Sequence, residues 1–377
     1  MHDPFPLPRS ERLTALVEPV ANYLGLKTLP LHIHEVVFAF TLYHLTNKYV
    51  APAFSRFFFP RIYATFNART KLNWDVHIVS FVQSTLINTL ALYVMWKDED
   101  RGDMDWQGRV WGYTGAGGVI QGFAAGYFLW DLVITLQNVA IFGPGMLAHA
   151  VSALFVFSLG FRPFVNYYAP TFILYELSSP FLNIHWFCDK LNLTGSKIQL
   201  YNGIFLLATF FSCRLMWGSY QSIRVFSDIY RAMKSGSVVI NDAELGKLQD
   251  PNSIYQSELM RYAGNREVPL WLPFCYLASN VVLNGLNWFW FGKMIATIRK
   301  RFDPPLGTKK ASEKVSQSEK VLVEGIHVET PGVIVNGNGT DYLDVKQTSV
   351  DVQNKSRTLE VQQTEVKNRS GSTRRRG

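Results

Sequence analysis

Charged residues are scarce in this sequence. Asp, Glu, Lys and Arg make up 18% of the 377 residues, whereas hydrophobic residues make up 48%. The charges that are present crowd into connecting segments and the last quarter of the chain, so the remainder is more apolar than the average indicates. This composition favours a protein that lies largely within a membrane.

Cysteine is nearly absent, and only Cys188, Cys213 and Cys275 occur. No two of them have the Cys-x-x-Cys spacing, and all three lie in or beside apolar segments. The pattern excludes a disulfide framework and provides no cysteine-based metal site. We therefore expect neither a bound metal nor a cofactor.

Two other features are missing from the sequence. The N-terminus lacks the charged start, short apolar core and small-residue cleavage site of a signal peptide, so insertion would depend on the first membrane helix. A basic face for nucleic acid is not indicated either, because the net charge of +8 comes largely from the C-terminal portion. We interpret this charge as attraction to an anionic membrane surface.

Long apolar runs are abundant. A transmembrane helix needs about 20 mostly apolar residues to cross about 30 Å of hydrocarbon. Seven segments meet this requirement, at residues 31–51, 74–96, 116–137, 145–161, 165–187, 200–222 and 270–298. The sequence therefore predicts an all-α, polytopic membrane helix bundle with about seven transmembrane helices.

The predicted spans divide the chain into six parts. These are an interfacial N-terminal segment (1–30), a first membrane helix and loop (31–72), a membrane core (73–231), a polar loop (232–269), a last membrane helix (270–301) and a basic tail (302–377). The tail is rich in Ser, Thr, Lys and Gln without helical periodicity, so we predict that it is disordered. Basic residues after the last span favour a cytosolic C-terminus, although Arg224 and Arg231 argue for the opposite orientation.

The stretch 118–190 contains ionisable and amide side chains where hydrocarbon is expected: Asp131, His149, Glu176, Asn183 and His185. Such groups are costly at membrane depth unless they face a partner or a watery cavity, which makes them functional candidates. Since the first three lie on successive predicted helices, we expect them to converge. Each of these three residues also has a structural alternative. Asp131 would cap a helix or tie two helices together, His149 would be a hydrogen-bonded structural histidine, and Glu176 would be a buried, paired carboxylate.

Two predicted helices carry a distinctive face. Four polar residues at offsets of three, seven and eleven share one face of the second span: His77, Ser80, Ser84 and Asn88. They either pair helices or contribute to a lipid site, with His77 as the candidate contact. On the third span, small residues that allow close helix packing repeat at every fourth position: Gly118, Gly122 and Gly126.

Residues 73–231 resemble a TLC domain, the family named for the translocation-associated, longevity-assurance and neuronal ceroid lipofuscinosis proteins. The resemblance rests on Tyr-Phe-Leu-Trp-Asp-Leu at 127–132, on Met-Leu-Ala-His at 146–149 and, most specifically, on residues 175–187. It is closer to the small transmembrane-protein branch than to ceramide synthases, and it indicates a fungal member. The resemblance implies an endoplasmic-reticulum membrane protein concerned with sphingolipid N-acylation or with lipid sensing, trafficking or homeostasis.

The chain departs from the catalytic members of that family. Ceramide synthases carry adjacent histidines followed by a run with paired aspartates, whereas here Ala148 precedes His149, and Glu176 with Asn183 stands in the acidic region. Gln83 also stands where relatives of the small branch tend to have a histidine. These differences argue against acyl transfer and leave the fold assignment intact.

Two functions follow from these residues. In the favoured one, the protein is not an enzyme, and it binds, senses or handles a membrane lipid in a polar cavity formed by Asp131, His149, Glu176, Asn183 and His185, together with His77. In the alternative, the protein is an acyltransferase that uses acyl-coenzyme A as co-substrate. His149 would then take a proton from the nucleophile, and Asp131 or Glu176 would orient the imidazole.

Overall fold

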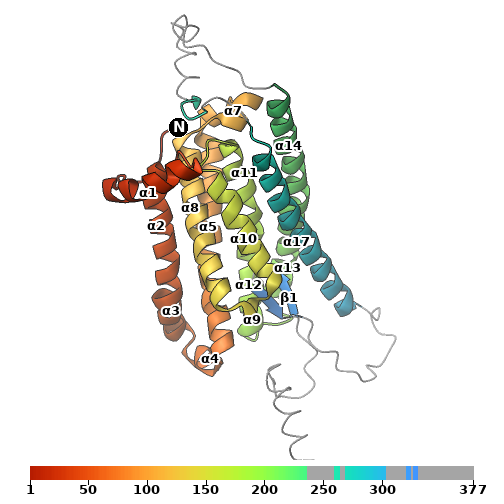
Figure 1. Cartoon of the computed structure of the whole chain (residues 1–377). Helices are drawn as coiled ribbons and strands as arrows, with labels where there is room; N and C mark the ends of the chain where they lie inside the picture. The colour runs from red at the N-terminus through yellow and green to blue at the C-terminus, as the bar shows by residue number, and fades with distance from the viewer. Residues whose placement is uncertain (236–258, 264–267, 303–319, 324–325, 330–377) are drawn as a thin grey trace, which may run out of the picture. The chain divides into compact units, whose positions relative to one another are not determined.

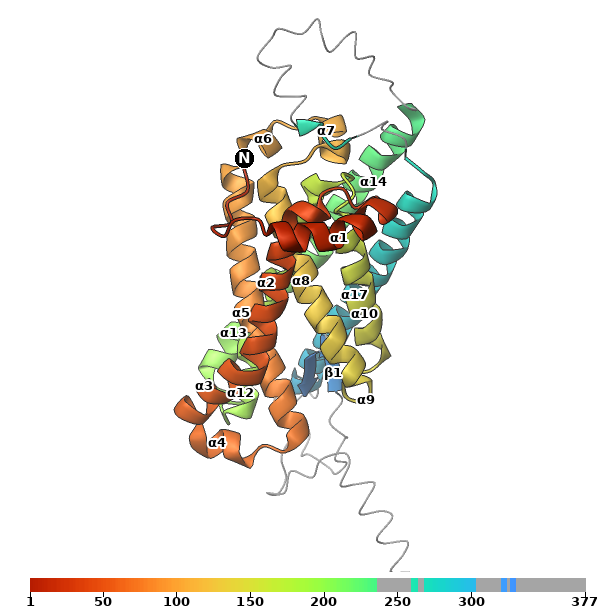
Figure 2. The same cartoon turned by 60° about the vertical axis from the view of Figure 1, so that its left-hand side comes forward.

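The structure is a computed structural model that describes residues 1–235, 259–263, 268–302, 320–323 and 326–329 (Figure 1). All of these residues belong to one compact unit, Met1–Pro331. The long helices α2, α5, α8, α10 and α17 run alongside one another, and α1 crosses one end of them (Figures 1 and 2). The described part of the chain is helical except for one pair of short strands.

The helices follow the chain in this order: α1 (Glu11–Leu24), α2 (Leu29–Leu45), η1 (Thr46–Val50), α3 (Ala51–Phe58), α4 (Pro60–Thr65), α5 (Ala68–Lys97), α6 (Glu99–Gly102), α7 (Trp106–Trp111), α8 (Gly115–Gln137), α9 (Val139–Phe142), α10 (Pro144–Leu159), η2 (Asn166–Tyr168), α11 (Ala169–Ile173), η3 (Leu174–Ser178), α12 (Ser179–Lys190), α13 (Lys197–Thr209), η4 (Phe210–Trp217), α14 (Gly218–Ser235) and α17 (Trp271–Phe302).

Side-chain caps fix where the long helices begin. Asn67 accepts a hydrogen bond from the amide of Thr70 at 2.8 Å at the start of α5, and Thr114 accepts one from Gly117 at 3.1 Å at the start of α8. Each bond satisfies one of the amides that the first helical turn leaves without a partner. The cap residues therefore set the register in which α5 and α8 present their polar faces.

The glycines of α8 pack against α2. A Cβ atom added at Gly122 would lie 2.5 Å from Oε2 of Glu35, and one added at Gly126 would lie 2.5 Å from the carbonyl oxygen of Val36. A Cβ atom added at Gly118 would lie closer still, against Nε2 of His32. Only residues without a side chain allow this approach, so the repeat of small residues brings α2 and α8 into direct backbone contact.

The fifth predicted span, 165–187, is not one helix. It consists of η2, α11, the 3₁₀ segment η3 and α12. Pro180 lacks an amide hydrogen, and its ring clashes with the carbonyl group of the residue four positions earlier, which is Glu176. The tighter winding of η3 accommodates this break, and it places Glu176 in the middle of the 3₁₀ segment.

Three helical stretches of the described chain are long and apolar enough to cross a membrane: Ala68–Lys97, Trp106–Gln137 and Lys197–Ser235. The apolar helix Pro144–Leu159 is shorter. Helices occupy the remaining predicted spans as well, so the all-helical architecture is confirmed for the described residues, apart from one short strand pair. The number of seven spans stays a prediction.

Most of the predicted disordered tail, 302–377, lies outside the described residues. Within it, strand β1 (Lys320–Val323) pairs antiparallel with β2 (Ile326–Glu329), and Lys320 lies opposite Glu329. Both strands are rich in β-branched residues, which favour extended backbone. The tail composition did not indicate this local pairing.

Candidate functional site

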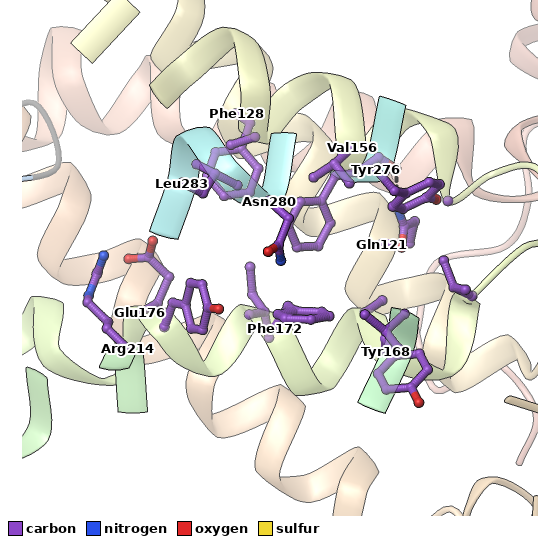
Figure 3. Close-up of a pocket in the computed structure, with 18 of the residues that line it drawn as sticks. Gln121, Phe128, Val156, Tyr168, Phe172, Glu176, Arg214, Tyr276, Asn280 and Leu283 are labelled. Atoms are coloured by element: carbon purple, nitrogen blue, oxygen red, sulfur yellow. Dashed lines mark hydrogen bonds between the residues drawn. The ribbon is translucent and has the colours of Figure 1, made fainter. Parts of the chain in front are cut away.

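A cavity lies among α8, α10, α11, η3, η4, α14 and α17, and we call it the central cavity (Figure 3). Its empty space, the open end included, is about 960 Å³. Most of its wall is aromatic or aliphatic, with contributions from Phe128, Val156, Phe157, Phe172 and Leu283. A lining of this kind suits an apolar molecule.

One end of the central cavity is ionic. Figure 3 shows the carboxylate of Glu176, from η3, beside the guanidinium of Arg214, from η4. Glu176 and Arg214 are 5% and 1% exposed, so both charges are withdrawn from solvent. Each charge therefore depends on the other for compensation.

Hydrogen bonds hold the Arg214 guanidinium in place. Its Nε donates to Oγ of Ser178 at 2.8 Å, and its Nη2 donates to Oγ of Ser179 at 3.2 Å. Its Nη1 donates to Oδ1 of Asn287, on α17, at 3.2 Å. The guanidinium thus joins η3, α12, η4 and α17 at the ionic end of the cavity.

The backbone around this ionic end is irregular on both sides. Glu176 lies in a 3₁₀ segment, and Arg214 lies in the eight-residue π-helical segment η4. These two segments pack against each other. Insertions of π-helix are rare in proteins, but those that occur often lie at functional sites. The contact between these two irregular segments therefore marks the position as a candidate site.

His149 faces the same cavity from α10. Its ring lies 5.8 Å from the ring of Trp290 in an edge-on arrangement. Nδ1 of His149 is buried and has no hydrogen-bond partner among the residues that the structure describes. The imidazole of His149 interacts electrostatically with Arg214, at the ionic end of the cavity. Within the described chain, no carboxylate forms a hydrogen bond with this imidazole.

Asp131 is buried on α8 and does not belong to the cavity lining. It interacts electrostatically with Glu176 and with the hydroxyl of Tyr127. No hydrogen bond joins Asp131, His149 and Glu176 to one another within the described chain. Asp131 thus interacts with Glu176, whereas His149 interacts with Arg214, and the predicted direct convergence of all three groups is not seen in the described residues.

Asn183 and His77 form a separate polar contact between α12 and α5. Oδ1 of Asn183 lies 2.8 Å from Nδ1 of His77, and its Nδ2 donates to Oγ of Ser80 at 3.1 Å. The ring of His77 stacks on Trp186 with a centroid distance of 3.9 Å. Neither residue lines the central cavity, and both pair helices, which was the alternative role of the α5 polar face.

His185 points in another direction. It lies beside α13, where a Cβ atom added at Gly203 would be 3.5 Å from the imidazole ring. It does not line the central cavity either. Of the six predicted site residues, the structure places Glu176 and His149 in the cavity wall, and it places Asp131, Asn183, His185 and His77 elsewhere.

Arg214 was not identified from the sequence as part of the site. It is a single arginine within an apolar run, which is the signal by which it could have been found. The spacing of Asn280, Asn284 and Asn287 in the sequence does predict a polar interior face on α17. Nδ2 of Asn280 donates to Oγ of Ser222 at 2.9 Å, and Nδ2 of Asn284 donates to Oδ1 of Asn280 at 2.8 Å. These amide side chains extend the polar side of the cavity along α17.

Long apolar helices that enclose a cavity with buried charges define a helical membrane protein. Within that class, the chain belongs to the TLC domain family, whose domain matches residues 73–296. The expected family is thereby confirmed. The match extends beyond residue 231 and includes most of α17, which supplies one wall of the cavity.

The relatives of the chain are TLC domain-containing proteins rather than ceramide synthases. An uncharacterised TLC domain-containing protein of Schizosaccharomyces pombe is 36% identical over 78% of this chain and 89% of its own length. The topoisomerase I damage affected protein 4 of Saccharomyces cerevisiae is 28% identical over 74% of this chain and 88% of its own. Human TLC domain-containing protein 4 is 29% identical over 48% of this chain and 65% of its own. No solved structure matches the chain.

Proposed function

We propose that this protein is a multi-pass membrane protein of the endoplasmic reticulum that acts in lipid homeostasis by binding, sensing or handling a lipid in the central cavity. The observation that carries the proposal is the division of that cavity into a long apolar wall and one ionic end at Glu176 and Arg214. A lipid has the same division. The endoplasmic-reticulum location rests on the family resemblance alone.

The cavity accommodates the two parts of a lipid by different interactions. An acyl chain lies against Phe128, Phe157 and Phe172, where each buried methylene contributes about 0.8 kcal/mol. A polar headgroup exchanges hydrogen bonds with Glu176 and Arg214, which are already ordered by their neighbours. Little ordering of side chains then opposes binding.

Filling the cavity tests this proposal. Ala153 is 2% exposed on α10 and lines the cavity, whereas Ala148, on the same helix, is exposed. We expect Ala153→Phe to reduce the lipid that co-purifies with the protein at least tenfold, measured by mass spectrometry of the extracted lipid, because the new ring occupies the acyl-chain space. Ala148→Phe is the matched control and retains the lipid. Equal lipid content in both variants contradicts the proposal.

Acyl transfer is the second candidate, and the buried Nδ1 of His149 without a hydrogen-bond partner is the observation in its favour. A general base needs its imidazole oriented by a partner, and here the charged group that interacts with the imidazole is the cation Arg214. We therefore favour binding. Transfer of an acyl group from acyl-coenzyme A by the purified protein, abolished in His149→Ala, would reverse this preference.

A further inference from the structure

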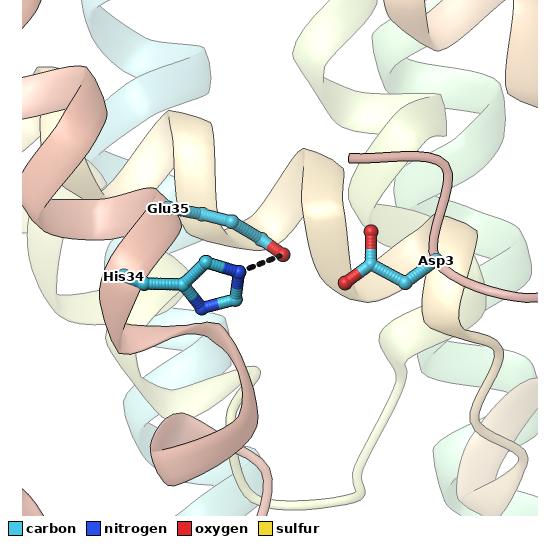
Figure 4. A group of neighbouring side chains, drawn as sticks. All are labelled: Asp3, His34 and Glu35. Carbon is cyan, nitrogen blue, oxygen red and sulfur yellow. Dashed lines mark ion pairs between the residues drawn. The ribbon is translucent and has the colours of Figure 1, made fainter. Parts of the chain in front are cut away.

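A second cluster of chemically active side chains lies outside the lining of the central cavity, where the N-terminal segment crosses the start of α2. Its members are Asp3, His34 and Glu35 (Figure 4). One ligand atom from each residue lies within 4.8 Å of the other two. We propose that these three side chains form a binding site for a divalent transition-metal ion such as Zn²⁺.

The donor set fits this class of ion. It offers one imidazole nitrogen and two carboxylate oxygens, which are ligand types that zinc accepts, and three protein ligands leave a further position for water. An imidazole ligand favours zinc and similar ions over calcium or magnesium, which prefer oxygen ligands alone. Ligand atoms around a tetrahedral zinc ion are about 3.4 Å apart, so the present spacing closes with small side-chain rotations.

Burial makes the cluster unlike an ordinary group of surface acids. The side chain of Glu35 is 0% exposed and that of His34 is 9% exposed. Nε2 of His34, the ring nitrogen that faces the cluster, lies 3.8 Å from Oε1 of Glu35. Asp3 is the most exposed of the three ligands, with 33% of its side chain accessible. A buried carboxylate that faces an imidazole nitrogen is stabilised by a cation between them.

His32 supplies the support that metal-binding carboxylates require. Its Nδ1 lies 2.9 Å from Glu35, and its Nε2 meets the hydroxyl of Tyr113. If the tyrosine donates to Nε2, then Nδ1 carries the hydrogen and donates to the carboxylate. Both carboxylate oxygens of Glu35 lie 2.9 Å from this nitrogen, so His32 fixes the orientation of the carboxylate, as partners of metal-binding carboxylates do.

The third ligand comes from a different part of the chain. Figure 4 shows the carboxylate of Asp3 pointing from the N-terminal segment towards Glu35 on α2. Phe5 follows in the same segment, and its ring packs 5.5 Å from the ring of His34. An ion at this site therefore fastens the N-terminal segment to α2. The sequence alone did not indicate the site, because Asp3 is distant from the other two ligands along the chain.

Zinc titration of the full-length protein tests the proposal. The protein is purified in detergent with a tag that contains no histidine, stripped with a chelator and titrated with Zn²⁺ against a fluorescent zinc indicator. We expect one tightly bound zinc per chain. Asp3→Asn and His34→Ala should each weaken binding at least tenfold, and neither removes the buried Glu35 on which local packing depends.

Two control variants each remove a histidine that is not a proposed ligand and leave Asp3, His34 and Glu35 in place. His2→Ala changes the neighbour of Asp3, and His44→Ala changes an exposed histidine of α2, so both should bind zinc like the unmodified protein. Added zinc should also protect the N-terminal segment from protease in the unmodified protein and not in Asp3→Asn. The absence of a 1:1 site, or equal affinity in Asp3→Asn, His34→Ala and the two controls, overturns the proposal.

Discussion

At the scale of single residues, Arg214 has the most demanding environment in the described structure. It is 1% exposed, it lies within an apolar helix, and it gives hydrogen bonds to Ser178, Ser179 and Asn287. Its charge compensates that of Glu176. Removal of one member of such a buried pair leaves an uncompensated charge and costs about 3–5 kcal/mol.

We accordingly expect Arg214→Met to destabilise the purified protein by about 3–5 kcal/mol in thermal or denaturant unfolding. Glu176→Gln added to this variant should recover part of the loss, because the isolated carboxylate is then neutral. Arg231→Met, at an exposed arginine later in the same continuous helix, is the control and should change stability by less than about 0.5 kcal/mol. No recovery in the double variant would show that Glu176 and Arg214 are independent.

Residue chemistry also explains which site residues the sequence could identify. Glu176 and Asp131 stand out because a carboxylate in hydrocarbon is costly, and both are buried in the interior. Asn183 and His77 stand out because polar side chains are also costly in hydrocarbon, yet the two form a hydrogen bond with each other. A helical face can be derived from spacing, whereas the identity of the facing side chain depends on how two helices pack.

At the scale of helices, α2 and α8 approach each other most closely at the glycines of α8, where an added Cβ atom would meet α2 at 2.5 Å or less. A Cβ atom at Gly126 would lie 2.5 Å from the carbonyl oxygen of Val36 and 2.7 Å from Cβ of Ala39. Both neighbours are backbone or short, rigid side chain, so neither can rotate away. The helices would have to separate.

We expect Gly126→Ala to destabilise the protein by about 1–3 kcal/mol, the usual cost of overpacking. Gly285→Ala is the control, because Gly285 lies within α17 and has no atom within 4 Å of an added Cβ. Alanine has the higher helix propensity, so that substitution should be neutral or stabilising by up to about 1 kcal/mol. Parallel unfolding curves of the two variants provide the comparison, and a similar loss in both would contradict the tight α2–α8 contact.

The long helices were predictable from the sequence, whereas the irregular ones were only partly so. Apolar length and composition identify α5 and α8, and a shorter apolar run identifies α10. Pro170 and Pro180 predict a break in the fifth segment, but they do not determine which type of helix the chain forms between them. The π-helical segment η4 contains no proline or glycine, and its winding depends on what it packs against.

At the scale of the whole molecule, orientation in the membrane is the property with the clearest test. Seven spans would place the two ends on opposite sides, and the basic residues after α17 favour a cytosolic C-terminus. We expect a C-terminal epitope to be digested by protease in intact microsomes. The glycosylation sequon Asn192-Leu193-Thr194 follows the fifth predicted span. It should remain unglycosylated, because five spans between it and a lumenal N-terminus place it on the cytosolic side. Glycosylation of Asn192 in the native protein would contradict this orientation.

The 3₁₀ segment η3 has a geometric consequence for the parts on either side of it. Its five residues turn about 120° each instead of 100° and rise about 2.0 Å each instead of 1.5 Å. Helix α12 consequently starts about 100° further round, and about 2.5 Å further along, than an unbroken α-helix would place it. The winding of η3 therefore helps to set the angle about the helix axis between Glu176, which lines the cavity, and Asn183, which contacts α5. A return of η3 to α-helical winding would turn one of these side chains away from its present surroundings.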